Sequence, residues 1–241
     1  RFKFWIKMIF RNDFDSKVCE VENYFSFLEK VEYEYVFLFK KGEEKPFIIN
    51  DELFKILKAN GFLILYNLIE STILNTVVSI FDEIKQQNLS YADISEKIRL
   101  YWSKHKYKYD ETITEKRLFE KFHQIVNEII NNIPIEIINR IEYGGSLDAK
   151  KIRKVSSDLG IDFSEEHYKE NKHGECFLKI KNYRNSLAHG KKSFSEIGRE
   201  ITYNEIDNIL GLKNYKDFTI EHLTHFLDSV EEYIESEKYK I

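Results

Sequence analysis

Apolar side chains recur every three or four residues over most of the chain, which is the spacing of amphipathic helices. The pattern predicts helices at about 14–39, 51–81, 90–102, 112–132, 148–159 and 175–190, and a last one after Thr219. Residues 31–36 also alternate as a strand would, so the end of the first helix stays open. The second helix is apolar on most of its circumference between residues 62 and 81, and we expect it to be the buried centre of the fold.

Short polar residues, glycines and prolines mark the expected helix ends. Asn50 or Asp51 is expected to cap the second helix, because a short polar side chain can accept a hydrogen bond from the first free backbone N–H groups. Thr202-x-x-Glu205 has the pattern of a capping box. The other expected boundaries are Pro134, Gly144-Gly145, Gly160 and Gly190.

The composition supports an all-α fold. With 9 Gly and 2 Pro in 241 residues, the chain lacks the turn residues that a β-sandwich or barrel needs. We find no repeat, no low-complexity segment and no linker, which indicates one helical domain. Cys19 and Cys176 lie far apart and neither is in a C-x-x-C pair, so we expect no disulfide framework and a reducing, cytoplasmic location.

The chain contains no familiar nucleotide, metal or hydrolase motif. The patterns G-x-G-x-x-G, G-x-x-x-x-G-K, H-E-x-x-H and G-x-S-x-G are all missing, and the acidic residues are spread along helix faces. We therefore expect no cofactor and no metal. No apolar run reaches the roughly 18 residues of a spanning helix, so we expect no membrane partner.

The first residues leave two interpretations open. Met8 is the only methionine of the chain. Residues 1–7 are therefore either a non-native leader or the product of an unusual start codon.

One segment carries candidate chemistry: Arg184-Asn185-Ser-Leu-Ala-His189-Gly, followed by Ser193-Phe-Ser-Glu-Ile-Gly-Arg199. This extended motif resembles the HEPN superfamily, specifically the bacterial standalone HEPN-like ribonucleases with R-N-x-L-A-H-G and S-F-x-E-x-G-R. Two upstream stretches, 65–70 and 145–153, are also similar to that family. The resemblance covers about residues 50–235. It implies a HEPN-type helical bundle at 46–241, with residues 1–45 as an additional N-terminal helical extension.

The spacing of the motif argues for a site shared by two chains. Five helical residues turn by about 500°, so Arg184 and His189 lie about 140° apart and about 7.5 Å apart along the axis. One helix therefore cannot easily aim both at the same phosphate, whereas two copies facing each other across a two-fold axis can. Asn185 shares a face with His189 and can orient its ring. The resemblance likewise implies a composite site in a homodimer cleft.

These residue types suit RNA cleavage without a metal ion. RNA carries its own nucleophile, the 2′-OH, and histidine can take or give its proton near neutral pH. Arg184 can stabilise the charge that develops on the phosphate. We expect Arg184, His189 and Asn185 to be catalytic. Glu70, a carboxylate in the most apolar helix, is expected to support the motif helix through a salt bridge or hydrogen bond, with Arg184 as one possible partner.

The net charge of −4 at first argues against a nucleic-acid partner. Lysines nevertheless crowd the motif, and we expect Lys181, Lys191 and Lys192 to bind RNA. Further basic clusters lie at 150–154 and at 101–109, where Tyr101 and Trp102 are candidates for base stacking.

The resemblance implies a toxin or antiphage defence effector, with an antitoxin or regulatory protein as a further partner. In related HEPN toxins that are silenced by modification, R-x-x-x-x-H-x-Y ends in a tyrosine, whereas this chain has Lys191 there. That route of inactivation is therefore not expected here. The alternative interpretation is a catalytically weak HEPN module that binds nucleic acid or serves as a scaffold.

Overall fold

The computed structural model describes residues 2–34, 36–39, 41–42, 45–107, 113–136, 146–163, 173–206 and 210–241. Its helices are α1 (Phe2–Tyr33), α2 (Asp51–Gln86), α3 (Glu96–Tyr107), α4 (Glu115–Ile130), α5 (Ala149–Leu159), α7 (His173–Ala188), α8 (Phe194–Arg199) and α9 (Leu212–Glu235). Strands β1 (Phe37–Leu38) and β2 (Phe47–Ile48) pair antiparallel, with Phe37 opposite Ile48 and Leu38 opposite Phe47. The predicted all-α class is confirmed.

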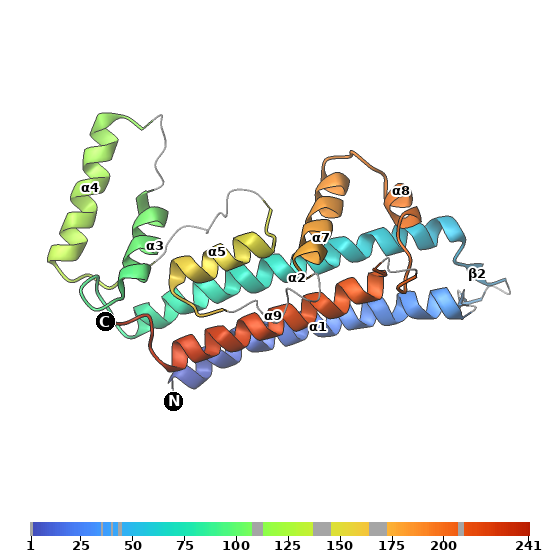
Figure 1. The fold of residues 1–241 in the computed structure, drawn as a ribbon, viewed down its shortest axis with the longest axis horizontal. Helices are drawn as coiled ribbons and strands as arrows, with labels where there is room; N and C mark the ends of the chain where they lie inside the picture. The colour runs from blue at the N-terminus through green and yellow to red at the C-terminus, as the bar shows by residue number, and fades with distance from the viewer. Residues whose placement is uncertain are drawn as a thin grey trace.

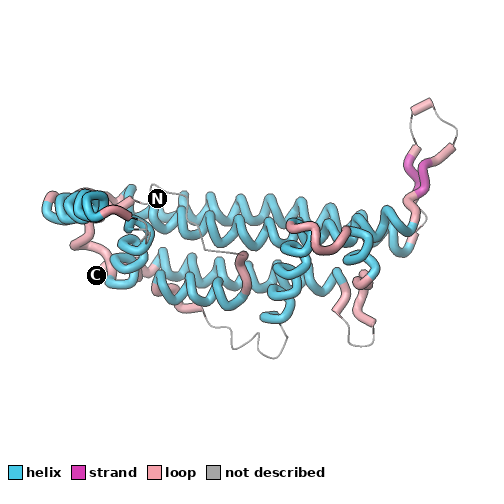
Figure 2. Tube along the Cα trace, turned by 90° about the horizontal axis from the view of Figure 1, so that it is seen from above, coloured by secondary structure: helices cyan, strands magenta, loops and turns pink. Residues whose placement is uncertain are grey.

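Three long helices form the body of the molecule (Figure 1). α1, α2 and α9 lie side by side along the longest axis, α7 packs against α2 and α9, and α5 packs against α3 and α7. α8 packs on the first turns of α2. The pair α3 and α4 stands at one end of the body, and the β-hairpin projects from the other end (Figure 2). The motif helix α7 is therefore held by the central helix and not by the extremities.

The central position of α2 follows from its composition. Leu65, Ile69, Ile73 and Val77 are fully buried, as the apolar pattern predicts. Asn50 is the N-cap, and its side-chain Oδ1 accepts a hydrogen bond from the Leu53 N–H at 2.8 Å. By length and hydropathy alone α2 could cross a membrane, but 56% of its most apolar window is buried inside the protein. The buried core helix of a bundle passes the same test, so this is weak evidence for a membrane span.

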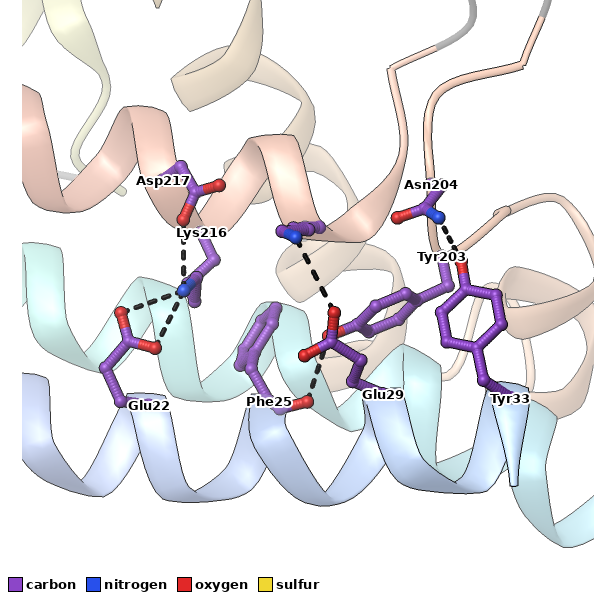
Figure 3. Close-up of polar contacts among 9 residues, drawn as sticks. Glu22, Phe25, Glu29, Tyr33, Tyr203, Asn204, Lys216 and Asp217 are labelled. Atoms are coloured by element: carbon purple, nitrogen blue, oxygen red, sulfur yellow. Dashed lines mark hydrogen bonds and ion pairs between the residues drawn. The ribbon is translucent and has the colours of Figure 1, made fainter. Parts of the chain in front are cut away.

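Polar contacts fasten α1 to the rest of the body (Figure 3). Lys216 of α9 donates to both carboxylate oxygens of Glu22, at 2.7 and 2.8 Å, and the Tyr203 hydroxyl donates to the Phe25 carbonyl at 3.0 Å. Burial disfavours the Lys216 ammonium, yet Glu22 and Asp217 outweigh burial and raise the pKa of Lys216. The side chains of Phe25 and Leu28 are at most 1% exposed. α1 therefore shares the hydrophobic core of the helices that follow it.

The first helix differs from the prediction at both ends. It begins at Phe2, well before residue 14, because Phe10 and Phe14 continue the same apolar stripe and are buried. It ends at Tyr33 and not near residue 39, because Phe37 and Leu38 pair with the second strand. The alternation at residues 31–36 therefore signalled a strand that lies slightly further along the chain.

Three other predicted boundaries are wrong. The last helix begins at Leu212 and not after Thr219. Ser90 does not begin a helix: its N–H and hydroxyl both donate to Asp93, forming a turn that precedes α3. Thr202 does not form a capping box, and its hydroxyl instead donates to the Asn204 carbonyl at 2.7 Å. The end of α5 is as predicted, with Gly160 in the left-handed region at φ 83°. The predicted Gly144-Gly145 loop lies outside the described residues.

Candidate active site

The end of α7 has the backbone geometry that its sequence predicts. Gly190 has a φ of 64°, which an L side chain rarely adopts. The N–H of Gly190 donates to the Leu187 carbonyl at 3.2 Å, and that of Lys191 donates to the Ser186 carbonyl at 2.9 Å. These two bonds form a Schellman motif, which makes His189 the C-cap residue. Its side chain is exposed, so it can reach a ligand without a rearrangement of the core.

Arg184 lies one helical turn and a half earlier and is held in place on two sides. The centre of its guanidinium lies 4.6 Å from the centroid of the Tyr66 ring, which belongs to α2. Its Nη1 donates to the Asn185 side-chain Oδ1 at 3.1 Å. The arginine is therefore half-buried and positioned by a cation–π contact and a hydrogen bond.

The Asn185 side chain orients Arg184 and not His189. Besides the guanidinium, its Oδ1 accepts a hydrogen bond from the Ser146 hydroxyl at 2.8 Å. Its backbone carbonyl accepts the His189 N–H at 3.0 Å, which is the ordinary helical bond. In the described part of the chain no hydrogen bond joins the two side chains. The assigned role of Asn185 as a catalytic residue stays a prediction.

The segment Ser146–Asp148, which we name the clamp, joins three helices beside the motif. The Leu147 N–H donates to the buried Tyr66 hydroxyl at 3.0 Å, which fixes the ring that carries Arg184. Asp148 caps α5 by accepting the Lys151 N–H at 3.0 Å, and it also accepts from the Lys181 ammonium of α7 at 2.6 Å. The clamp thus ties α2, α5 and α7 together around Arg184.

Asp148 should make the fold sensitive to acid. Burial alone would raise its pKa, but the bonds from Lys181 and from the Lys151 N–H outweigh burial and lower it below its ordinary value. A carboxyl with a lowered folded-state pKa stabilises the fold above its unfolded pKa, near 4, and loses that stabilisation as the pH falls through the folded value. We expect Asp148→Asn to lower the urea midpoint at pH 7 and to approach wild type at about pH 2.

The control for that prediction lies on the same helix. Asp158 forms an i,i+4 ion pair with Lys154. Asp158→Asn should change the free energy of unfolding, measured by urea, by no more than about 0.5 kcal/mol at any pH. If the two variants show the same pH dependence, Asp148 has no special role in acid unfolding.

Tyr66 offers a second test of the clamp. Tyr66→Phe keeps the ring beneath Arg184 but leaves the buried Leu147 N–H without its acceptor, which should cost about 1–3 kcal/mol in the free energy of unfolding. The matched control is Tyr91→Phe, because Tyr91 also lies beneath an arginine, Arg99, at 5.0 Å. No hydrogen bond to the Tyr91 hydroxyl occurs among the described residues, so this variant should stay within about 0.5 kcal/mol of wild type. Equal losses in the two variants, measured by urea unfolding, would contradict the assignment.

The second half of the motif has a structural role. Ser193 and Glu196 form a capping box at the start of α8. Gly198 lies so close to α2 that a Cβ there would be 2.0 Å from the Lys55 carbonyl oxygen. The S-F-x-E-x-G-R pattern therefore docks the segment after His189 onto α2, and so fixes where the motif loop leaves α7.

The lysines around the motif are only partly free to meet RNA. Lys181 is paired with Asp148, and Lys192 is paired with Glu200 at 2.6 Å, which raises the pKa of Lys192. Lys191 is exposed and forms no ion pair with a described residue. RNA binding by all three lysines stays a prediction. It requires that Lys181 and Lys192 leave their carboxylate partners and pair with phosphate groups of the RNA.

Two further predictions concern base stacking by Tyr101 and Trp102 and the support role of Glu70. The rings of Tyr101 and Trp102 are 3% and 1% exposed, so the prediction that they stack on bases is wrong: they are core residues of α3. Glu70 is half-buried on α2, one turn after Tyr66. No hydrogen bond or ion pair between Glu70 and Arg184 occurs in the structure as described, and the support role of Glu70 stays a prediction.

The positioning residues around Arg184 were not identified from the sequence. Tyr66, Ser146 and Asp148 lie in the two upstream stretches that resemble the family, but only Glu70 was selected from them. The signal available in the sequence was the position of Ser146 and Asp148, because polar residues directly before a helix often cap or position it.

Among the described residues no group of three or more His, Cys, Asp or Glu side chains could hold a metal ion.

Comparison with known families decides the broader identity of the chain. A family model described as MAE_28990-like HEPN matches residues 9–239. The chain belongs to this HEPN family. The match extends the resemblance seen at residues 50–235 to most of α1. The division of the chain into an N-terminal extension, 1–45, and a HEPN-type bundle, 46–241, stays a prediction. HEPN domains are often endoribonucleases, and membership indicates a nuclease, RNA-related or nucleotide-binding function. Searches of curated proteins and of solved structures found no significant match.

Proposed function

We propose that this HEPN protein is a metal-independent endoribonuclease that cleaves RNA at a composite site in a homodimer. The observation that supports it most is the state of the motif: His189 is exposed at the end of α7, while Arg184 is positioned by Tyr66 and Asn185. An arginine held by two neighbours loses little conformational entropy on meeting a phosphate. An exposed imidazole at the end of the same helix supplies proton transfer.

The proposed reaction is a transesterification. One histidine removes the proton of the 2′-OH, the 2′ oxygen forms a bond to phosphorus, and the bond from phosphorus to the 5′ oxygen breaks. A second histidine gives its proton to the departing 5′ oxygen. Arg184 donates hydrogen bonds to the non-bridging oxygens, where the negative charge of the transition state develops. The products are a 2′,3′-cyclic phosphate and a 5′-OH.

Two chains supply the two histidines in this proposal. Each chain presents one His189 at the end of one α7. The second histidine of the reaction therefore comes from a second chain. An isologous contact through the exposed ends of α7 places both copies of Arg184 and His189 around one cleft. The proposal includes a cytoplasmic location, a role as a toxin or antiphage effector, and restraint by an antitoxin or regulatory protein.

Expression in cells tests the proposal as a whole. Wild type should stop growth and produce cleaved RNA, whereas Arg184→Ala should do neither while remaining folded and dimeric. Purified wild type should sediment as a dimer at the concentration at which it cuts RNA. A strictly monomeric enzyme that still cleaves RNA contradicts the composite site, and wild type that cuts no RNA contradicts the nuclease assignment.

The second candidate is a HEPN module that binds nucleic acid or acts as a scaffold without turnover. The ion pairs of Lys181 and Lys192 favour its scaffold form, because they leave less positive charge for any nucleic acid. In that case Arg184→Ala should weaken RNA binding or partner assembly, and neither wild type nor variant should produce new RNA ends.

A further inference from the structure

The β-hairpin exposes a cluster of large apolar side chains. Five of its side chains are between 47% and 69% exposed: Phe37, Leu38, Phe39, Phe47 and Ile48. It projects from the end of the bundle, away from the helices (Figure 2). A two-stranded hairpin is at best marginally stable alone in water, and an exposed apolar patch on a folded protein usually marks an interaction site.

One edge of this hairpin is available for backbone pairing. β1 and β2 form a two-stranded sheet, so within the described residues each strand bonds to a neighbour on one side only. β1 also borders a cleft of about 430 Å³ between the end of α1 and the hairpin, lined among others by Val31, Val36 and Ile49. An added strand could bond to the free edge while its side chains enter this cleft, whose lining also includes Glu32 and Glu34.

The charges beside β1 say which strand fits. The chain before β1 carries the exposed carboxylates of Glu32 and Glu34, and the first described charge after β1 is the exposed ammonium of Lys41. Neither Glu34 nor Lys41 forms an ion pair with a described residue. An antiparallel copy of the same strand brings its basic end to the acidic start of the first, and its acidic start to the basic end. β1 is therefore electrostatically complementary to itself.

The free edge of β2 is a weaker candidate. The acidic residues that follow it, Asp51 and Glu52, already share Lys55 within the first turn of α2. α2 begins at Asp51, shortly after β2 ends at Ile48. The charge pattern therefore favours β1.

We propose that β1 pairs antiparallel with β1 of a second copy, forming a four-stranded sheet across a two-fold axis near Phe37 and Leu38. Backbone hydrogen bonds and burial of the aromatic side chains supply the affinity, and the pairs between Glu34 and Lys41 of different copies fix the antiparallel direction. Such a contact is isologous and buries the free edges of both β1 strands. It does not depend on RNA cleavage.

Disulfide cross-linking tests this contact separately from any contact through α7. In a Cys19→Ser background, Leu38→Cys places a thiol beside the expected axis, so mild oxidation should link two chains. Cys176 does not interfere, because it is fully buried and burial raises the pKa of its thiol. The matched control is Leu100→Cys on α3, where the native side chain is 52% exposed against 49% for Leu38.

Charge reversal makes the test specific for the antiparallel strand pair. Added to Leu38→Cys, the change Glu34→Lys should slow cross-linking about tenfold, and a further Lys41→Glu should restore the rate. The rates should be the same in a His189→Ala background, which separates this inference from the proposed catalysis.

Three outcomes would overturn the inference. The first is cross-linking of the Leu38→Cys variant that is no faster than that of the Leu100→Cys control. The second is a rate that Glu34→Lys leaves unchanged. The third is binding of the monomer to phosphatidylglycerol vesicles through the hairpin without cross-linking, which would assign the apolar tip to a membrane surface.

Discussion

Replacing His189 by alanine should reduce RNA cleavage by about 10²–10⁴-fold and leave the fold intact. The loss follows from its proposed role in proton transfer, for which the motif contains no second imidazole. The fold is unaffected because the side chain is exposed and the cap geometry at Gly190 rests on backbone bonds. The measurement is the initial rate of cleavage of a labelled RNA, together with a urea unfolding curve.

His123→Ala is the matched control for this prediction. His123 is an exposed histidine on α4, at the end of the molecule away from the α7 motif (Figure 1). Its loss should leave the cleavage rate within about twofold of wild type. Equal rates for wild type and His189→Ala would remove His189 from the reaction, whatever the control shows.

Gly198→Ala should destabilise the protein by about 3 kcal/mol or more, the largest stability effect that we expect from a single methyl group. Its Cβ would lie 2.0 Å from the carbonyl oxygen of Lys55 and 2.7 Å from the Lys55 Cα. Both atoms are backbone, so neither can move aside as a flexible side chain could. α8 must therefore shift away from α2, and the urea midpoint should fall by on the order of 1 M.

Gly174→Ala separates the contact from the mere addition of a methyl group. Gly174 is exposed in the first turn of α7, and a Cβ there meets nothing within 4 Å. Because alanine favours helix more than glycine does, this variant should be neutral or slightly more stable. If Gly198→Ala unfolds at the same urea concentration as Gly174→Ala, the close packing of α8 on α2 is wrong.

The features predicted best from the sequence are those that local chemistry determines. The buried stripe of α2, the Asn50 cap, the left-handed Gly160 and the cap at His189 and Gly190 each depend on neighbours within a few residues. The motif likewise predicted which helix carries Arg184 and His189. The HEPN assignment is confirmed by the family match over residues 9–239.

The features that sequence reasoning missed depend on contacts between distant segments. The end of α1 is set by pairing with residues 47–48, which no local pattern around residue 39 reveals. Arg184 is positioned by Tyr66, more than a hundred residues earlier, and Asn185 by Ser146. Lysines next to His189 look available in the sequence, but Lys192 is paired with Glu200 once the chain turns back at α8. Ser193-x-x-Glu196 and Thr202-x-x-Glu205 have the same local capping pattern, and a helix begins only after Ser193.

In the proposed reaction the 2′-OH of RNA is the nucleophile at a site formed by Arg184 and His189. The most direct test uses a labelled oligonucleotide with one ribonucleotide in a DNA strand, incubated with purified protein in EDTA, and identifies the ends of the products. We expect cleavage only after the ribonucleotide, leaving a 2′,3′-cyclic phosphate and a 5′-OH, and none after 2′-O-methylation of that ribose. Products with a 3′-OH, or cleavage that persists when the 2′-OH is blocked, would contradict it.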